Sequence, residues 1–303
     1  MKLKFEPGYK KLLETGELEN RVEQAKKHLK ECNLCPHECN IDRKEKIGFC
    51  RANDQAIVSS YGPHFGEETP LVGKNGSGTI FFGYCNMRCV FCQNCELSFG
   101  SEGEAISNEK LAKIMLQIQN HYRCHNINFV TPTHFTANIL EALLFAAREG
   151  LNLPLVYNCG GYEKTEILAL LAGVIDIYMP DFKYHIPEMG LTYSKVKDYP
   201  EKAKAALKEM DRQVGGLKLD ETGIAYKGML IRHLVMPGNL ENTKEILKFI
   251  KEELSSDCLV NIMDQYYPAH EAFKYENISE PLSPEEYEEA KLFAIRLGLR
   301  LAK

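Results

Sequence analysis

Four cysteines stand within eleven consecutive residues of this chain, in the segment CNMRCVFCQNC. The first three, Cys85, Cys89 and Cys92, have the spacing C-x3-C-x2-C, and Cys95 follows three positions later. Three thiolates so close together can bind three irons of a cubane [4Fe–4S] cluster and leave the fourth iron without a protein ligand. An open metal position is typical of a catalytic site. We therefore expect Cys85, Cys89 and Cys92 to hold a [4Fe–4S] cluster, with Cys95 as a spare thiol.

A second set of cysteines, with the spacing C-x2-C-x3-C-x10-C, comprises Cys32, Cys35, Cys39 and Cys50. Their segment is polar, so it is not expected to fold without a metal. Four thiolates complete a closed site, which suits either structural zinc or a second Fe–S cluster. His37 offers a substitute ligand. The alternatives are four packed or redox-active thiols.

Two C-x2-C pairs also allow a different grouping of the cysteines. Cys32 with Cys35 and Cys92 with Cys95 would form a zinc ribbon. The gap between the pairs is much longer than in ordinary ribbons, and Cys85 and Cys89 would be left unused. The chemistry therefore favours two separate sites.

Composition and charge limit the classes of protein to consider. The chain has 303 residues, 44% hydrophobic and 26% charged, with a formal net charge of −5. Basic and acidic residues are mixed throughout, so no nucleic-acid partner is expected. The first 20 residues are charged where a signal peptide needs an apolar run, and no apolar run approaches the ~18 residues that cross a bilayer. Eight of the eleven cysteines lie in the two sets above, which indicates metal binding in a reducing, cytoplasmic compartment without membrane association.

From residue 78 onward, short apolar runs alternate with amphipathic segments. The runs predict strands at 78–83, 126–131, 153–158, 174–180, 228–238 and 258–268. The amphipathic segments predict helices at 107–122, 135–150, 163–173, 200–215, 242–254 and 283–299, with Ser107 and Ser283 as N-caps. Apolar strands separated by helices predict an α/β fold with a parallel sheet. The region is shorter than the roughly 250 residues of an eight-stranded barrel, so we expect a partial (β/α)6 TIM barrel.

The predicted elements suggest two parts. Residues 1–77 carry an amphipathic helix over 1–30 and the cysteine-rich, metal-binding extension, followed by irregular loops. Residues 78–303 form the barrel. The loop with Cys85 follows its first strand directly, at the barrel end where catalytic groups lie.

The segment CNMRCVFC, with an aromatic residue before its third cysteine and a glycine-bounded strand before its first, resembles the cluster loop of the radical S-adenosylmethionine superfamily. The resemblance implies a partial (β/α)6 barrel and a cluster whose open iron binds S-adenosylmethionine. It further implies reductive cleavage of that cofactor to a 5'-deoxyadenosyl radical, which abstracts hydrogen from a substrate.

The segment MPDFK, with Met179, Asp181 and Lys183, resembles the M-x-D-x-K segment of pyruvate formate-lyase activating enzymes. This resemblance implies that Asp181 and Lys183 lie near the methionyl part of S-adenosylmethionine. Arg232, in IRHLVMPG, is similar to an arginine of that family, and its guanidinium suits a carboxylate. In those enzymes the additional cluster cysteines follow the C-x3-C-x2-C loop, whereas here they precede it.

Polar residues after two further strands are expected to contact S-adenosylmethionine. Thr131 and Thr133, in VTPTHF, stand where the superfamily often has a Gly-Gly-Glu segment, and His134 is beside them. Asn158, in YNCGGYE, follows the third strand.

Together these patterns predict a radical S-adenosylmethionine enzyme, an oxidoreductase that resembles activating enzymes. We expect a protein or peptide substrate, with a glycyl radical as one product of that type, and an electron donor such as flavodoxin or ferredoxin. The alternatives are the same chemistry on a small molecule, or a zinc-binding module without catalysis.

Overall fold

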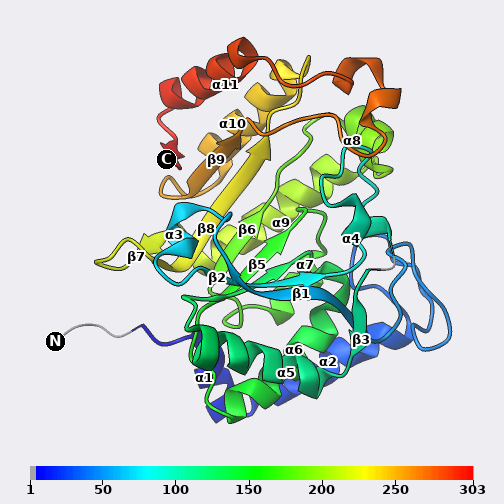
Figure 1. Ribbon diagram of the computed structural model, residues 1–303, viewed down its shortest axis with the longest axis vertical. Coiled ribbons are helices and arrows are strands. Elements are labelled where there is room, and N and C mark those ends of the chain that lie inside the picture. Colours follow the sequence, from blue (N-terminus) through cyan, green and yellow to red (C-terminus); the bar gives the residue numbers. More distant parts are fainter. Residues whose placement is uncertain (1–4, 101, 303) are drawn as a thin grey trace.

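The computed structural model describes residues 5–100 and 102–302, and its centre is one large β-sheet with helices on the connections (Figure 1). Within these residues, six parallel strands follow one another in space in chain order. They are β2 (Ser77–Phe82), β4 (Ile127–Val130), β5 (Leu155–Cys159), β6 (Ile177–Pro180), β8 (Ala225–Leu234) and β9 (Leu259–Met263). Most of their side chains are buried, because helices and loops cover the sheet. The fold is mixed α/β with a parallel-dominated sheet, consistent with the predicted partial barrel.

The helices predicted between these strands are all present. They are α5 (Asn108–Gln117), α6 (Thr136–Arg148), α7 (Thr165–Leu170), α9 (Tyr199–Val214), α10 (Leu240–Glu253) and α11 (Pro284–Arg296). The two predicted N-caps are confirmed, since Ser107 accepts from the backbone N–H of Lys110 and Ser283 from that of Glu286, each at 3.2 Å. The helix expected over 107–122 ends as a π-helix, Ile118–Tyr122.

Several elements were not predicted. They are the strands β1 (Ala56–His64), β3 (Glu104–Ile106), β7 (Lys218–Leu219) and β10 (Arg300–Leu301), and the helices α3 (Thr69–Val72), α4 (Cys95–Phe99) and α8 (Pro187–Ser194). Strand β1 corrects the expectation of irregular loops up to residue 77. Only its first residues alternate in burial, and the remainder contains glycine and proline. Pairing with β2 on one side and β3 on the other holds it extended.

The predicted N-terminal helix is two helices, and residues 1–4 of the predicted range lie outside the described residues. These helices are α1 (Gly8–Glu14) and α2 (Glu17–Lys30). Gly16 separates them with a φ of +73°, a left-handed conformation that glycine adopts without strain. Leu18 and Val22 are buried, and α2 packs along α6 (Figure 1).

The predicted division between residues 77 and 78 stays a prediction. Strand β1 lies on its N-terminal side and pairs with β2 on the other side. Among residues 5–100 and 102–302, no helix has both the length and the apolar character that spanning a bilayer requires.

Candidate active site

The loop that follows β2 carries the three predicted cluster cysteines, and we call residues 84–92 the cluster loop. It begins at Tyr84, whose φ of +68° is unusual for a residue other than glycine. It leads to the short helix α4, which begins at Cys95. The cluster loop therefore lies at the carboxyl end of a parallel strand, where α/β barrels have their active sites.

Each of the three thiols has a polar neighbour in or near the loop. The Ser194 hydroxyl donates to Cys89 Sγ at 3.0 Å. Cys85 Sγ accepts from the backbone N–H of Met87 at 3.4 Å. The Cys92 thiol hydrogen-bonds the Ser98 hydroxyl at 3.5 Å.

Burial and charge act in opposite directions on these thiols. Burial raises the pKa of Cys85, Cys89 and Cys92, that of Cys89 to about 11. Hydrogen bonds to each thiol and the Lys183 ammonium lower the pKa of all three. A nearby cation and hydrogen-bond donors favour thiolates, which are the form that binds iron.

The donor set fits a [4Fe–4S] cluster with one open iron. Three cysteines share one loop and face one lysine, with Cys89 buried and Cys85 and Cys92 partly buried, and no fourth cysteine is needed. In the described part of the chain, no group of three or more His, Cys, Asp or Glu side chains is arranged to hold a single metal ion. A cubane does not require such an arrangement, because each thiolate binds a different iron.

A chain of charged side chains extends from the cluster loop across the neighbouring strand ends. Lys183 Nζ lies 2.6 Å from Asp181 Oδ2, and Arg232 Nε lies 2.8 Å from Asp181 Oδ1. Arg232 also donates to Asn158 Oδ1 at 2.8 Å. The structure therefore brings together four of the predicted site residues, from the ends of β5 and β6 and from β8.

The charges in this chain support one another. Burial alone raises the pKa of Asp181, but the neighbouring Arg232 and Lys183 charges outweigh burial and hold it below its usual value. The pKa of Lys183 is raised in turn: burial lowers it, and Asp181 and Cys89 more than compensate. All three side chains are therefore charged at neutral pH. Such a group can meet the ammonium and carboxylate of a zwitterion.

The two threonines predicted after β4 lie in different surroundings. Thr131 has a φ of +59°, a strained conformation for a β-branched residue, and its N–H donates to the Asn158 carbonyl at 2.9 Å. Thr133 is buried, and its hydroxyl donates to Glu163 Oε1 at 2.6 Å. Tyr157 donates to the other Glu163 oxygen at 3.2 Å. Thr131 therefore borders Asn158 of the charged chain, whereas Thr133 belongs to a buried network around Glu163.

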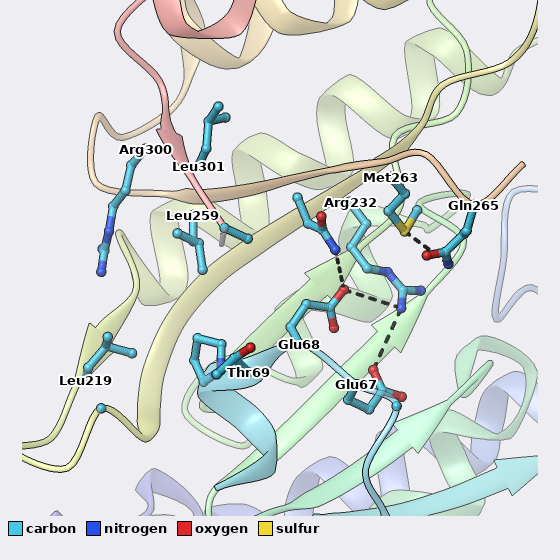
Figure 2. A pocket seen from close by; sticks show the side chains of 15 residues that line it. Glu67, Glu68, Thr69, Leu219, Arg232, Leu259, Met263, Gln265, Arg300 and Leu301 are labelled. Atoms are coloured by element: carbon cyan, nitrogen blue, oxygen red, sulfur yellow. Dashed lines mark hydrogen bonds and ion pairs between the residues drawn. The ribbon is translucent and has the colours of Figure 1, made fainter. Parts of the chain in front are cut away.

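Two glutamates that the sequence analysis did not select complete the charged chain. The side chains of Glu67 and Glu68 are each 7% exposed and lie 3.8 and 3.9 Å from the Arg232 guanidinium (Figure 2). Asn261 Nδ2 donates to Glu68 Oε1 at 3.1 Å. These residues line a cavity of about 520 Å³ along β8 and β9. In the sequence the two glutamates resemble ordinary surface charges of a loop. Their place in the site depends on contacts with residues far along the chain, such as that of Glu68 with Asn261, 193 residues away.

The N-terminal cysteines lie together in residues 32–50, a segment without helices or strands. Burial is the main cause that raises the pKa of Cys35, and Cys50 and Cys32 add to it. Cys32 and Cys39 act in the same way on Cys50, where burial is again the main cause. Cys39 Sγ accepts from the backbone N–H of Phe49 at 3.4 Å. The four thiols are therefore neighbours, although in this structure they are not arranged to hold a single metal ion.

Arg43 is fully buried beside these cysteines. It donates to the carbonyls of His134, at 2.6 Å, and Asn53, and its charge lowers the pKa of Cys50 against the effect of burial. Its Nε has no hydrogen-bond partner. Within the described residues, Arg43 forms no ion pair with a carboxylate. A buried guanidinium without a carboxylate needs another source of negative charge.

The two cysteine regions touch each other. His37 Nε2 lies 2.8 Å from the carbonyl oxygen of Asn86, in the cluster loop. Arg88 of the same loop donates to the Phe49 carbonyl at 3.0 Å and lies over the Phe49 ring. His37 stacks on that ring at 3.9 Å. Residues 32–50 therefore pack against the cluster loop.

Solved structures with a similar fold include a domain of pyruvate-formate lyase-activating enzyme from Bacteroides vulgatus, with 13% identity, a TM-score of 0.38, and coverage of 52% of this chain and 83% of that one. Streptococcus suis SuiB bound to S-adenosylmethionine has 15% identity and a TM-score of 0.48, with coverage of 72% and 48%, so the match spans about half of SuiB. Methylornithine synthase (PylB) has 12% identity and a TM-score of 0.47, with coverage of 96% and 74%. These matches are likenesses of fold at low scores. At these scores the cofactor and activity must be argued from the site itself.

No protein-family model matches the sequence. Two proteins of Methanocaldococcus jannaschii are related to it over most of its length. Uncharacterized protein MJ0808 is 24% identical over 297 residues, 89% of this chain and 79% of the relative. Uncharacterized protein MJ0674 is 36% identical over 292 residues, 94% of this chain and 80% of the relative. The chain therefore belongs to the same family as MJ0674.

Proposed function

We propose that this protein is a radical S-adenosylmethionine oxidoreductase with its [4Fe–4S] cluster on Cys85, Cys89 and Cys92. The single observation that carries the proposal is the juxtaposition of these thiols with the chain Lys183–Asp181–Arg232. When bound and reduced, the cluster supplies the electron that cleaves S-adenosylmethionine to methionine and a hydrogen-abstracting 5'-deoxyadenosyl radical. An isolated zinc module has no need for a buried, charged chain at the open side of its thiols.

The protein's own residues hold and orient the cofactor in this proposal. Arg232 and Lys183 bind the methionyl carboxylate, and Asp181 keeps both cations in place. Asn158 and Thr131 offer amide and hydroxyl groups at the adjacent strand ends. Thr133 acts indirectly, since its hydroxyl is engaged by Glu163. Burial of the cluster loop excludes water from the reacting groups.

The N-terminal cysteines Cys32, Cys35, Cys39 and Cys50 hold a second metal centre, either zinc or a second Fe–S cluster. With four thiolate ligands, either kind of centre, zinc or Fe–S, carries a net charge of minus two, and Arg43 neutralises one of these charges. The contact between His37 and the cluster loop supports a role beside the first cluster. If iron is bound there, the centre passes electrons inward from a donor such as flavodoxin or ferredoxin.

The substrate is a protein or peptide, in the manner of an activating enzyme, and a glycyl radical is one product of this type. A small-molecule substrate is the second candidate, favoured by the cavity of about 520 Å³ beside Arg232. We also propose a cytoplasmic location, because free thiols persist in a reducing compartment. We further propose that residues 1–77 and residues 78–303 form two structural units.

Anaerobic reconstitution with iron and sulfide tests the central claim. The wild-type protein is expected to turn brown and to show the absorption and, once reduced, the electron paramagnetic resonance of a [4Fe–4S] cluster. Cys85→Ala, Cys89→Ala and Cys92→Ala are each expected to bind about four fewer irons per chain and to lose the production of 5'-deoxyadenosine. Intact cleavage in these variants would refute the assignment.

A further inference from the structure

Cys89 differs from the other two thiols of the cluster loop in the group that contacts its sulfur. The Ser194 hydroxyl donates to Cys89 Sγ at 3.0 Å, and both residues are buried. Cys85 accepts from a backbone N–H at 3.4 Å, and the hydroxyl beside Cys92 lies 3.5 Å from its sulfur on a partly exposed residue. Cys89 therefore has the shortest of these three contacts, and a side chain shielded from water makes it.

A second hydroxyl lies behind Ser194. Tyr184 Oη is 2.7 Å from Ser194 Oγ, and both residues are fully buried. Because the single hydroxyl proton of Ser194 is donated to Cys89, Ser194 Oγ accepts the proton of Tyr184. The two bonds form a chain from Tyr184 through Ser194 to Cys89 Sγ, in which each bond polarises the next.

Backbone hydrogen bonds hold Ser194 opposite Cys89. Tyr193 and Ser194 are the last residues of helix α8, so their carbonyls have no partner within the helix. The N–H of Arg88 donates to the Ser194 carbonyl at 3.2 Å. The N–H of Val90 donates to the Tyr193 carbonyl at 2.8 Å. These two donors flank Cys89 in the sequence, so the end of α8 is fixed to the cluster loop where the hydroxyl meets the sulfur.

The hydrogen-bonded chain ends on an acceptor whose strength depends on its charge. A neutral thiol is a weak acceptor, whereas an ionised group accepts shorter and stronger hydrogen bonds. Burial raises the pKa of Cys89, and the bond from Ser194 lowers it, as expected for a donor that favours the thiolate. The chain is therefore best satisfied when the Cys89 sulfur carries negative charge, as it does when it binds iron.

Hydrogen bonds to the cysteine sulfurs of an iron–sulfur cluster help to set its reduction potential. Reduction adds one electron and makes the cluster and its thiolates more negative. A donor directed at a ligand sulfur stabilises this more negative form to a greater extent than the oxidised form. It therefore raises the reduction potential, and a weaker reductant can then supply the electron.

We propose that Ser194, supported by Tyr184, raises the reduction potential of the cluster held by Cys85, Cys89 and Cys92. Ser194 is a positioning residue in this role, because it acts on the cluster through Cys89. The cluster itself rests on the proposed function, and the electron comes from the flavodoxin or ferredoxin proposed there.

Anaerobic redox titration of the reconstituted full-length protein, followed by electron paramagnetic resonance of the reduced cluster, tests the proposal. In Ser194→Ala we expect the equilibrium constant of one-electron reduction to fall roughly tenfold, which is a midpoint potential about 59 mV more negative. Tyr184→Phe keeps the ring and should shift the midpoint in the same direction by a smaller amount. Ser77→Ala and Tyr178→Phe remove buried hydroxyls that are hydrogen-bonded elsewhere, and these matched controls should keep the wild-type midpoint.

An unchanged midpoint in Ser194→Ala would overturn the proposal, and so would an equal shift in Ser77→Ala. If Ser194→Ala does not fold, Tyr184→Phe decides in its place, and an unchanged midpoint there would overturn the proposal in the same way. A shift in Ser194→Ala without one in Tyr184→Phe would overturn the supporting role of Tyr184.

Two further observations keep this test separate from that of the proposed function. If the N-terminal centre also holds iron, the cluster-loop signal is the one that changes when S-adenosylmethionine is added, and only its midpoint should move. A wild-type cluster that shows the expected shift in Ser194→Ala but leaves S-adenosylmethionine intact would contradict the proposed function alone. Absence of any cluster in the wild-type protein would overturn both proposals.

Discussion

The two cysteine regions of this protein differ in what surrounds their thiols. The cluster loop faces a chain of ionised side chains at the ends of parallel strands and a cavity of about 520 Å³ beyond them. The N-terminal set is enclosed by residues 32–50 and by the buried Arg43. The first arrangement leaves room for an incoming ligand, and the second has only a fixed countercharge. On the proposed function, the three thiolates with an open side hold the reactive cluster and the four enclosed thiolates hold the second metal.

Removing one thiol from the cluster loop should have the largest effect. In Cys89→Ala, the cluster loses a ligand and production of 5'-deoxyadenosine should fall to background. Iron analysis and chromatography of the products measure the two effects. Cys124→Ala, a buried cysteine outside both regions, should keep iron and activity. Equal loss in both variants would mean that the cluster loop has no special role.

Breaking the charged chain should have the next largest effect. Asp181→Asn leaves Lys183 and Arg232 without their shared carboxylate, and breaking a buried pair costs roughly 3–5 kcal/mol. We expect a lower free energy of unfolding and at least about tenfold weaker binding of S-adenosylmethionine. Denaturant unfolding and equilibrium dialysis measure these. Asp264→Asn on the exposed surface is the control. Unchanged cofactor affinity in Asp181→Asn would mean that the charged side chains do not bind the cofactor together with the cluster loop.

Arg43 tests the enclosed region alone. Arg43→Met removes the countercharge, so the N-terminal metal should be lost to a chelator roughly tenfold more readily, while the cluster-loop iron remains. The metal released over time in anaerobic chelator solution measures this. Arg296→Met is an exposed control. If Arg43→Met instead releases metal from both regions equally, they form one site rather than two.

Acid is expected to have the smallest effect, a loss of folding stability through His134, which lies between the two cysteine regions. The His134 carbonyl accepts a hydrogen bond from Arg43, and His134 Nε2 lies 3.0 Å from the carbonyl oxygen of Gly83, next to the cluster loop. Burial lowers its pKa to about 3, so folding keeps it neutral while the unfolded chain protonates near 6.5. The stability it contributes is present above pH 6.5 and is lost as the pH falls toward 3. The change should be roughly 1–3 kcal/mol by pH 4.

Unfolding curves at several pH values test this point. His134→Gln should show a smaller loss of stability between pH 6.5 and pH 4 than the wild-type protein does. An identical slope in both proteins would assign the acid sensitivity to other groups.

Local sequence signals predict the scaffold of this site well. Periodicity and capping chemistry reveal the N-caps Ser107 and Ser283 and the parallel strands β2, β4, β5, β6, β8 and β9, because these features depend on nearby residues. Strand β1 was missed because its second half contains glycine and proline, and pairing with β2 and β3 rather than local sequence holds it extended. Asp181, Lys183 and Arg232 were selected by resemblance, and the structure places them in contact.

Long-range contacts account for what the sequence did not reveal. Glu67 and Glu68 acquire meaning only where their loop meets Asn261 and Arg232. Arg43 is one of many basic residues in the sequence, and only its burial distinguishes it. Ser194 likewise reaches Cys89 across 105 residues. No local pattern carries this information.

The most direct test is cofactor cleavage by the anaerobically reconstituted full-length protein, with its metal content measured in the same preparation. We expect dithionite-dependent formation of methionine and 5'-deoxyadenosine from S-adenosylmethionine. The account predicts about eight irons per chain for two cubanes, or about four irons and one zinc if the N-terminal centre is structural. A colourless protein that binds only zinc and leaves S-adenosylmethionine intact would contradict it.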